Sequence, residues 1–176
     1  MIFDMTQRAG GGGEETWYMN TGKYAENMVI PSSGAGSTRY VRDAYNGATH
    51  LKSFIQQYGT PSSDSDYGLF NGCTSLETVW VARATFGNYC FDNCTNLKHV
   101  TLGRVGLAVT SVSGSIFKNI PRLTKIEDVT VYVNASDLSG VPSAVKDRIV
   151  PSYSPGAVVT YKNYESGETI ATVTVT

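Results

Sequence analysis

Cys90, Cys94 and His99 are the residues of this chain whose types and spacing come closest to a reactive site. Two thiols and an imidazole spaced C-x3-C-x4-H could hold zinc, but a tetrahedral zinc site needs a fourth ligand, and none is apparent in the sequence. Both cysteines also fall at positions that recur as small core residues in the pattern described below. We therefore predict packing rather than metal binding here, and we expect no cofactor.

The other candidates for chemistry are weaker. His50 and His99 are the only histidines, and neither falls in a recognisable arrangement with a nucleophile or a general base. The four glycines at 10–13 lack the Gly-Lys-Ser/Thr that follows in a phosphate-binding loop. Asp64 and Asp66 could bind calcium, but an exposed polar loop is the commoner explanation for them. These observations predict that the protein is not an enzyme.

The composition excludes several classes of partner. A formal net charge of −1 over 176 residues gives no electrostatic argument for nucleic acid or for an anionic membrane surface. No stretch approaches the roughly 20 apolar residues of a transmembrane helix. Residues 1–5 lack the basic and apolar regions of a secretory signal, which leaves open a mature fragment or another route of export. We expect no contact with nucleic acid and no membrane insertion.

The elements that must position these side chains form a repeat. Four times an aromatic residue is followed six positions later by leucine, and the leucines recur every 21 to 26 residues. The pairs are Tyr45/Leu51, Phe70/Leu76, Phe91/Leu97 and Phe117/Leu123. A small or apolar residue lies midway in each pair, at Ala48, Cys73, Cys94 and Ile120. Three residues after the leucines come Phe54, Val79, Val100 and Ile126. A template recurring at this period predicts stacked coils that share one apolar core.

Each coil changes its period at the leucine. The aromatic, the small residue and the leucine lie at i, i+3 and i+6, which places them on one side of a short helical or 3₁₀ turn. After the leucine, in residues 76–81 and 97–102, apolar and outward residues alternate as in a half-buried strand. The strands of successive coils should pair in parallel. Residues 85–89 and 109–112 are expected to supply a second strand or turn per coil.

The best repeats carry a family resemblance. Residues 69–79 (LFNGCTSLETV) and 90–100 (CFDNCTNLKHV) resemble the BspA-type leucine-rich repeat, whose unit reads approximately A-F-x-x-C-x-x-L-x-x-[IV]-x-[IL]. Residues 44–51 and 116–123 fit it more loosely. The resemblance implies a surface-exposed bacterial protein involved in adhesion to host proteins, other cells or matrix. Similar repeats also occur in phage and prophage genes, and family adhesins are usually longer arrays than this one.

The expected fold is a β-rich α/β solenoid, a short leucine-rich-repeat stack of about four coils with caps at both ends. Residues 1–39 should form an N-terminal cap or linker carrying Trp17, Tyr18 and Tyr24, residues 40–134 the solenoid, and residues 135–176 a C-terminal cap or a small β element. Within the last segment we expect an extra rung at 129–133, a short helix within 139–149, and a hairpin from 157–161 and 169–175. Whether the hairpin caps the stack or begins a separate β-domain is left open.

The three cysteines are too few, and odd in number, for a disulfide framework. A Cys73–Cys94 bond between stacked coils is geometrically conceivable, since aligned Cα atoms would lie about 5 Å apart. The position requires only a small apolar group, which favours free, buried thiols.

If the third and fifth residues after each leucine point inward, the second and fourth point outward. The fourth-residue column is then Ile55, Trp80, Thr101 and Glu127, and the second-residue column is Ser53, Thr78, His99 and Lys125. The candidate binding patch is Trp80 with Ile55, Thr78, His99 and Thr101, because aromatic anchors dominate protein interfaces. The alternative is that a terminal segment covers Trp80. Directly after the leucines, Lys52, Glu77 and Lys98 alternate in sign, which predicts charge pairing between coils.

These features together predict a non-enzymatic protein- or glycan-recognition and adhesion module on a bacterial surface or a virion. The expected location is therefore extracellular, at a cell surface, or on a virus particle. The expected partner is a host or bacterial surface protein or glycan. The alternative is a structural component of a phage tail or similar assembly, whose partners would be copies of itself or other virion proteins.

Overall fold

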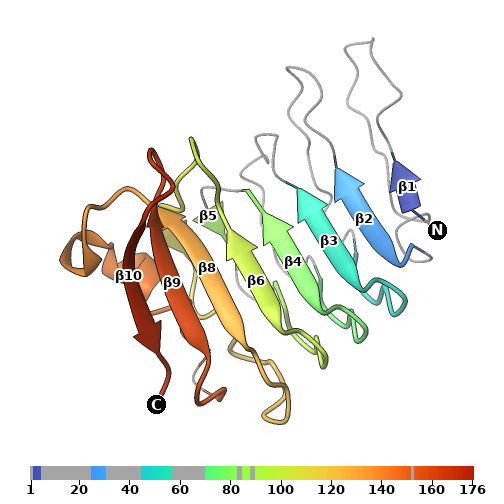
Figure 1. Cartoon of the computed structure of the whole chain (residues 1–176). Coiled ribbons are helices and arrows are strands. Elements are labelled where there is room, and N and C mark those ends of the chain that lie inside the picture. The colour runs from blue at the N-terminus through green and yellow to red at the C-terminus, as the bar shows by residue number, and fades with distance from the viewer. Residues whose placement is uncertain are drawn as a thin grey trace.

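The computed structural model describes residues 2–4, 25–30, 45–56, 70–82, 85–87, 90–151 and 153–176. Eight strands form one sheet in the order β1-β2-β3-β4-β6-β8-β9-β10 (Figure 1). Their bounds are β1 Ile2–Asp4, β2 Asn27–Ile30, β3 Ser53–Gln56, β4 Thr78–Val81, β6 His99–Leu102, β8 Asp128–Val133, β9 Val158–Asn163 and β10 Thr169–Thr174. A second sheet pairs β5 (Thr85–Phe86) with β7 (Ser111–Val112). A 3₁₀ turn at Leu138–Gly140 and the helix α1 at Ser143–Lys146 are short.

The architecture is a β-solenoid of about four turns with almost no helix. Every neighbouring pair of strands in the large sheet is parallel except β9 with β10. Parallel pairing in strict chain order is what stacked coils require, because each coil returns its strand to the same side. The parallel pairing expected for the leucine-adjacent strands and the second strand expected near 85 and 111 are both confirmed.

The aromatic residues of the repeat stack into one column through the core. The ring centroids of Tyr45 and Phe70 lie 5.6 Å apart, those of Phe70 and Phe91 5.7 Å, and those of Phe91 and Phe117 5.8 Å. The interplanar angles are between 6° and 15°, so the rings are stacked. Leu51, Leu76 and Leu97 form a second fully buried column, as the template predicted.

The fourth leucine breaks this column. Leu123 is 92% exposed, and the prediction that it is the fourth core leucine is wrong. His99 pairs in register with Asp128, so the residue beside Leu97, two positions earlier, is Ile126. The matching hydrogen bonds agree, since the Thr95 hydroxyl donates to Thr74 O and the Thr124 hydroxyl donates to Thr95 O, both at 3.1 Å. Residues 121–123 are an insertion that the chain loops out of the fourth coil.

The insertion shifts every later position of that coil by three residues. The outward residues of the fourth coil are Asp128 and Thr130, and not Lys125 and Glu127 as predicted. The strand expected as an additional rung at 129–133 is the fourth coil's own strand, β8. The physical reason is that a short surface loop costs little conformational entropy, whereas Ile126, Val129 and Val131 gain complete burial.

Both ends of the stack add strands to the same sheet. β1 and β2 pair in parallel ahead of β3, within the segment expected to be a cap or linker. The predicted hairpin is confirmed as β9 and β10, and β9 pairs in parallel with β8 while burying Val159 and Tyr161 in the common core. The division of the chain at 39/40 and 134/135 stays a prediction. The glycine run at 10–13, the aromatic segment 17–24 and the loop with Asp64 and Asp66 lie outside the described residues.

All three cysteines are buried, and they form no disulfide. The Cys73 thiol donates to Tyr45 O and the Cys94 thiol to Phe70 O, each at 3.0 Å. Burial raises the pKa of Cys73 to about 12 and raises the pKa of Cys94 well above its ordinary value. The protonated thiol at this position therefore fills a small space and also bonds the aromatic residue's carbonyl in the preceding coil. A Cys73–Cys94 disulfide is not formed.

Gln56 is fully buried, at 0% exposed, and neither its amide nitrogen nor its amide oxygen has a hydrogen-bond partner in the described part of the chain. An unsatisfied buried polar group costs about 1–3 kcal/mol. Gln56→Met keeps a similar volume, so we expect it to raise the free energy of unfolding by about 1–2 kcal/mol in urea titrations. Gln56→Glu, which buries a charge, should lower it. If Gln56→Met is no more stable than the parent, the Gln56 amide is not an unsatisfied buried group.

Candidate functional site

The outward face of the sheet brings the five predicted residues together. In β3, β4 and β6 the buried and half-buried residues alternate, and the half-buried ones point outward. Thr78 pairs with His99 in one column, while Ile55, Trp80 and Thr101 pair in the next. The three strands lie side by side in Figure 1. The geometry of the predicted patch is therefore that of one continuous surface over three coils.

Trp80 is fixed by the sheet's own backbone. It is half-buried, and its indole Nε1–H donates to the carbonyl oxygen of Gly103 at 3.0 Å. Gly103 directly follows β6, so the indole reaches along the neighbouring strand past Thr101. The N-terminal residues 5–24, which could provide a covering segment, lie outside the described residues. A tryptophan whose polar atom is already bonded loses little freedom when a partner packs on its exposed part.

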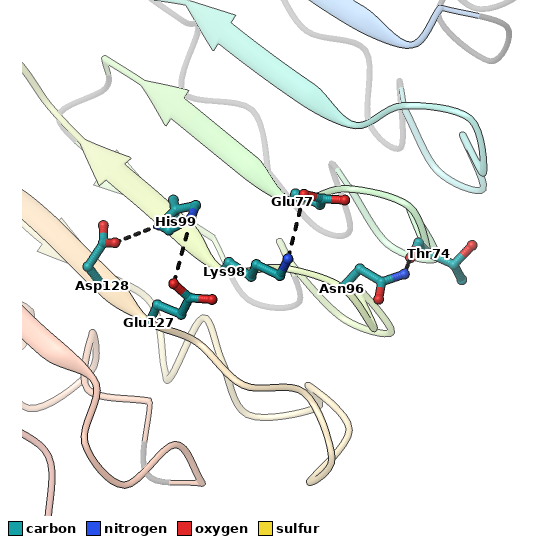
Figure 2. Close-up of polar contacts among 7 residues, drawn as sticks. All are labelled: Thr74, Glu77, Asn96, Lys98, His99, Glu127 and Asp128. Carbon is teal, nitrogen blue, oxygen red and sulfur yellow. Dashed lines mark hydrogen bonds and ion pairs between the residues drawn. The ribbon is translucent and has the colours of Figure 1, made fainter.

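His99 is flanked by two carboxylates from the fourth coil (Figure 2). Its Nδ1 lies 2.6 Å from Asp128 Oδ2, and its Nε2 lies 3.9 Å from Glu127 Oε2. In the Nδ1-protonated neutral ring or in the cation, Nδ1–H donates to Asp128. Both contacts join β6 to the start of β8, so the imidazole is held in one orientation. The cluster can present a polar, partly charged patch to a partner.

A row of alternating charges runs along the start of the strands. Glu26, Lys52, Glu77, Lys98 and Glu127 occupy the same position in successive coils. Lys52 lies 3.6 Å from Glu26, and Lys98 lies 3.7 Å from Glu77 (Figure 2). The predicted charge pairing is confirmed for Lys98 with Glu77, whereas Lys52 pairs with Glu26, a residue that the predicted column did not include. Each exposed pair contributes only a few tenths of a kcal/mol, so the row favours correct stacking more than it stabilises the fold.

Side chains also tie the turns of successive coils together. The Asn96 amide donates to Thr74 O at 2.6 Å (Figure 2). The Thr95 hydroxyl donates to the same oxygen. The Asn93 amide donates to Asn71 Oδ1 at 3.2 Å. Asn93 adopts a φ of 58°, the left-handed conformation that Gly72 adopts one coil earlier. These hydrogen bonds hold the turns of successive coils together, and we assign them no part in binding.

Sequence reasoning missed half of the outward face. Beside His99 it missed Asp128 and placed Glu127 in the wrong column, and beyond Thr101 a column of threonines continues across β8, β9 and β10. That column is Thr101, Thr130, Thr160 and Thr172. A signal was present, because residues 126–131 (IEDVTV) match residues 97–102 (LKHVTL) more fully than the segment beginning at Leu123 does.

The described part of the chain contains no group of three or more histidine, cysteine, aspartate or glutamate side chains placed to hold a metal ion. Nor do the described residues include a helix with the length and apolarity needed to cross a bilayer. Cys90 lies with Cys94 in the buried core, and its thiol donates to Gly87 O at 3.3 Å, while His99 lies on the outward face.

Comparison with protein-family models, with curated proteins and with solved structures gives no match to this chain.

Proposed function

We propose that this chain is a non-enzymatic recognition module of the BspA-type leucine-rich-repeat kind, which binds a surface protein or glycan through the outward face of its sheet. The observation that carries the proposal is Trp80, a large aromatic held by its bond to Gly103 among Thr78, His99 and Thr101. Fixed aromatic anchors surrounded by hydrogen-bonding groups are typical of binding hot spots. The extracellular, cell-surface or virion location belongs to this proposal.

The chemistry of His99 supports binding rather than catalysis. Asp128 occupies one ring nitrogen and Glu127 faces the other. A histidine acting as a general base on a hydroxyl nucleophile needs one nitrogen directed at that hydroxyl. Here both nitrogens face carboxylates, an arrangement that instead fixes the ring and creates an acidic rim.

A second candidate is a structural part of a phage tail or similar assembly. The observation favouring it is the outer edge of β10, with which no strand in the described part of the chain pairs, since such an edge can accept a strand from another chain. The two roles are compatible, because the outward face and the β10 edge are different surfaces.

Trp80→Ala should weaken partner binding at least about tenfold, since truncating a hot-spot tryptophan typically costs about 2 kcal/mol or more of binding free energy. The probes are an array of bacterial and host glycans and a panel of immobilised host matrix proteins, screened first with the parent chain. Because the indole donates a hydrogen bond, we also expect the free energy of unfolding to fall by about 1 kcal/mol. Trp80→Phe, which keeps an aromatic ring, should lose less affinity.

Leu123→Ala is the matched control, because Leu123 is exposed but belongs to the inserted loop and not to the outward face. It should bind like the parent. The patch assignment is wrong if Trp80→Ala binds as well as Leu123→Ala. If no glycan or matrix protein on either probe set binds the parent, the recognition proposal itself fails.

A further inference from the structure

The large sheet ends at β10, and no described strand pairs with its outer edge. On the inner side, Val175 N donates to Ala157 O at 2.9 Å and Val175 O accepts from Gly156 N at 2.8 Å. Successive residues of a strand direct their backbone groups to alternate sides. The amide and carbonyl groups of Thr172 and Thr174 therefore point away from β9, and both residues are exposed.

Nothing in the sequence of this edge protects it from pairing. Natural edge strands are usually blunted by lysine, proline, inward charges or bulges. Residues 169–176 (TIATVTVT) contain no charged residue, proline or glycine, and all but one are β-branched. The only irregularity is a register shift between Thr169 and Ala171, at the beginning of the strand. Residues 172–175 form a regular, open edge.

The strand that fits this edge best is a second β10. Antiparallel pairing centred on Thr172 places Thr172 opposite its own copy and Ala171 opposite Val173, so outward side chains stay outward and inward ones stay inward. No like charges meet, because the strand has none. The inner-side residues Ala171 and Val173 already pack against the core of their own chain. They would continue that core across the junction.

Pairing of β10 with the opposite sheet edge, β1, fits less well. β1 has three residues and β10 has six, so the shared ladder would be short. Such a head-to-tail contact would also propagate from copy to copy and produce open-ended stacks. The two-fold β10 contact closes on itself and covers both β10 edges at once.

We propose that two copies of this chain associate through antiparallel pairing of their β10 strands, which joins the two sheets into one. The threonine column would then run without interruption from Thr101 of one copy to Thr101 of the other, doubling the outward face. This inference does not depend on the recognition role of Trp80. It assigns β10 as a homotypic interaction surface.

The test is sedimentation equilibrium of the full chain from about 1 to about 300 µM, since a single strand pair buries less than a standard interface and should be a weak contact. The parent should approach twice the chain mass of 19.0 kDa at the upper end. Thr172→Pro removes an amide that points away from β9, so it should weaken association at least about tenfold with the intramolecular ladder intact. Thr172→Lys sets two ammonium groups opposite each other and should do the same.

Thr160→Lys is the matched control, because Thr160 lies in the same outward column but one strand inside the edge. It should dimerise like the parent. A parent that stays monomeric throughout the range, or assembles beyond two copies, overturns the proposal. So does a Thr172→Lys variant that dimerises like Thr160→Lys. If circular dichroism shows that Thr172→Pro is unfolded, the comparison of Thr172→Lys with Thr160→Lys alone tests the proposal.

Discussion

Phe91→Ala is expected to lower the free energy of unfolding by about 3–5 kcal/mol, the range seen for deleting a buried phenylalanine ring. Phe91 is 1% exposed and is stacked between Phe70 and Phe117, with centroid distances of 5.7 and 5.8 Å. Its loss opens a cavity and removes two aromatic contacts, each worth about 0.5–1.5 kcal/mol beyond burial. Because each coil packs only against its neighbours, the change weakens the packing of this coil against the coils before and after it.

The measurement is urea unfolding followed by far-ultraviolet circular dichroism. Phe91→Leu is the matched control: it fills part of the space without a ring and should cost clearly less. Phe117→Ala, with only Phe91 as its described stacking neighbour, should fall between the two. A loss below about 1 kcal/mol for Phe91→Ala would mean that the column does not hold the coils together.

The parts of the fold that the sequence predicted are those in which burial dictates residue type. The aromatic column, the leucine column of the first three coils, and the alternation in β4 and β6 all follow from apolar side chains that must face one core. The outward patch followed from the same alternation. Once Val79 and Val100 were assigned inward, Trp80 and His99 had to point out.

The fourth coil could not be placed by its leucine. Phe117 is followed by Leu123 at the expected spacing, but Ile126 fills the core instead. Spacing alone cannot tell a core leucine from one in an inserted loop, because loop length is nearly free in energy. The strand pattern of 126–131 was the better guide. Because the register was misassigned, the pairing of His99 with Asp128 was missed as well.

Other features depend on contacts between coils that no local pattern encodes. The thiols of Cys73 and Cys94 donate to carbonyls of residues 28 and 24 positions earlier in the chain, respectively. The bond from Trp80 to Gly103 joins residues 23 positions apart. These bonds become visible only when the coils are stacked. These hydrogen bonds fix the orientation of side chains whose positions, in the sequence, indicate only a small or an aromatic residue.

Gly103→Ala should produce the second large effect, lowering the free energy of unfolding by about 2–4 kcal/mol. Gly103 adopts a φ of 79°, which costs a residue with a Cβ atom roughly 1–2 kcal/mol. An added Cβ would also lie 2.8 Å from Leu107 O and 3.1 Å from Tyr132 Cβ. Leu107 O accepts from Arg104 N at 3.0 Å, so it cannot withdraw without opening the turn. Relieving such a clash costs about another 1–3 kcal/mol.

The variant also tests how Trp80 is held, because Gly103 O is the acceptor of its indole. Measured in a Trp17→Phe background, the emission maximum of Trp80 should shift to longer wavelength as the turn moves and the indole loses its partner. Gly156→Ala is the matched control: its φ is 90°, but an added Cβ meets nothing within 4 Å. It isolates the backbone cost and should leave the emission unchanged. If Gly103→Ala costs no more than Gly156→Ala and Trp80 emits as before, then the turn at 103–107 does not position the anchor of the outward face.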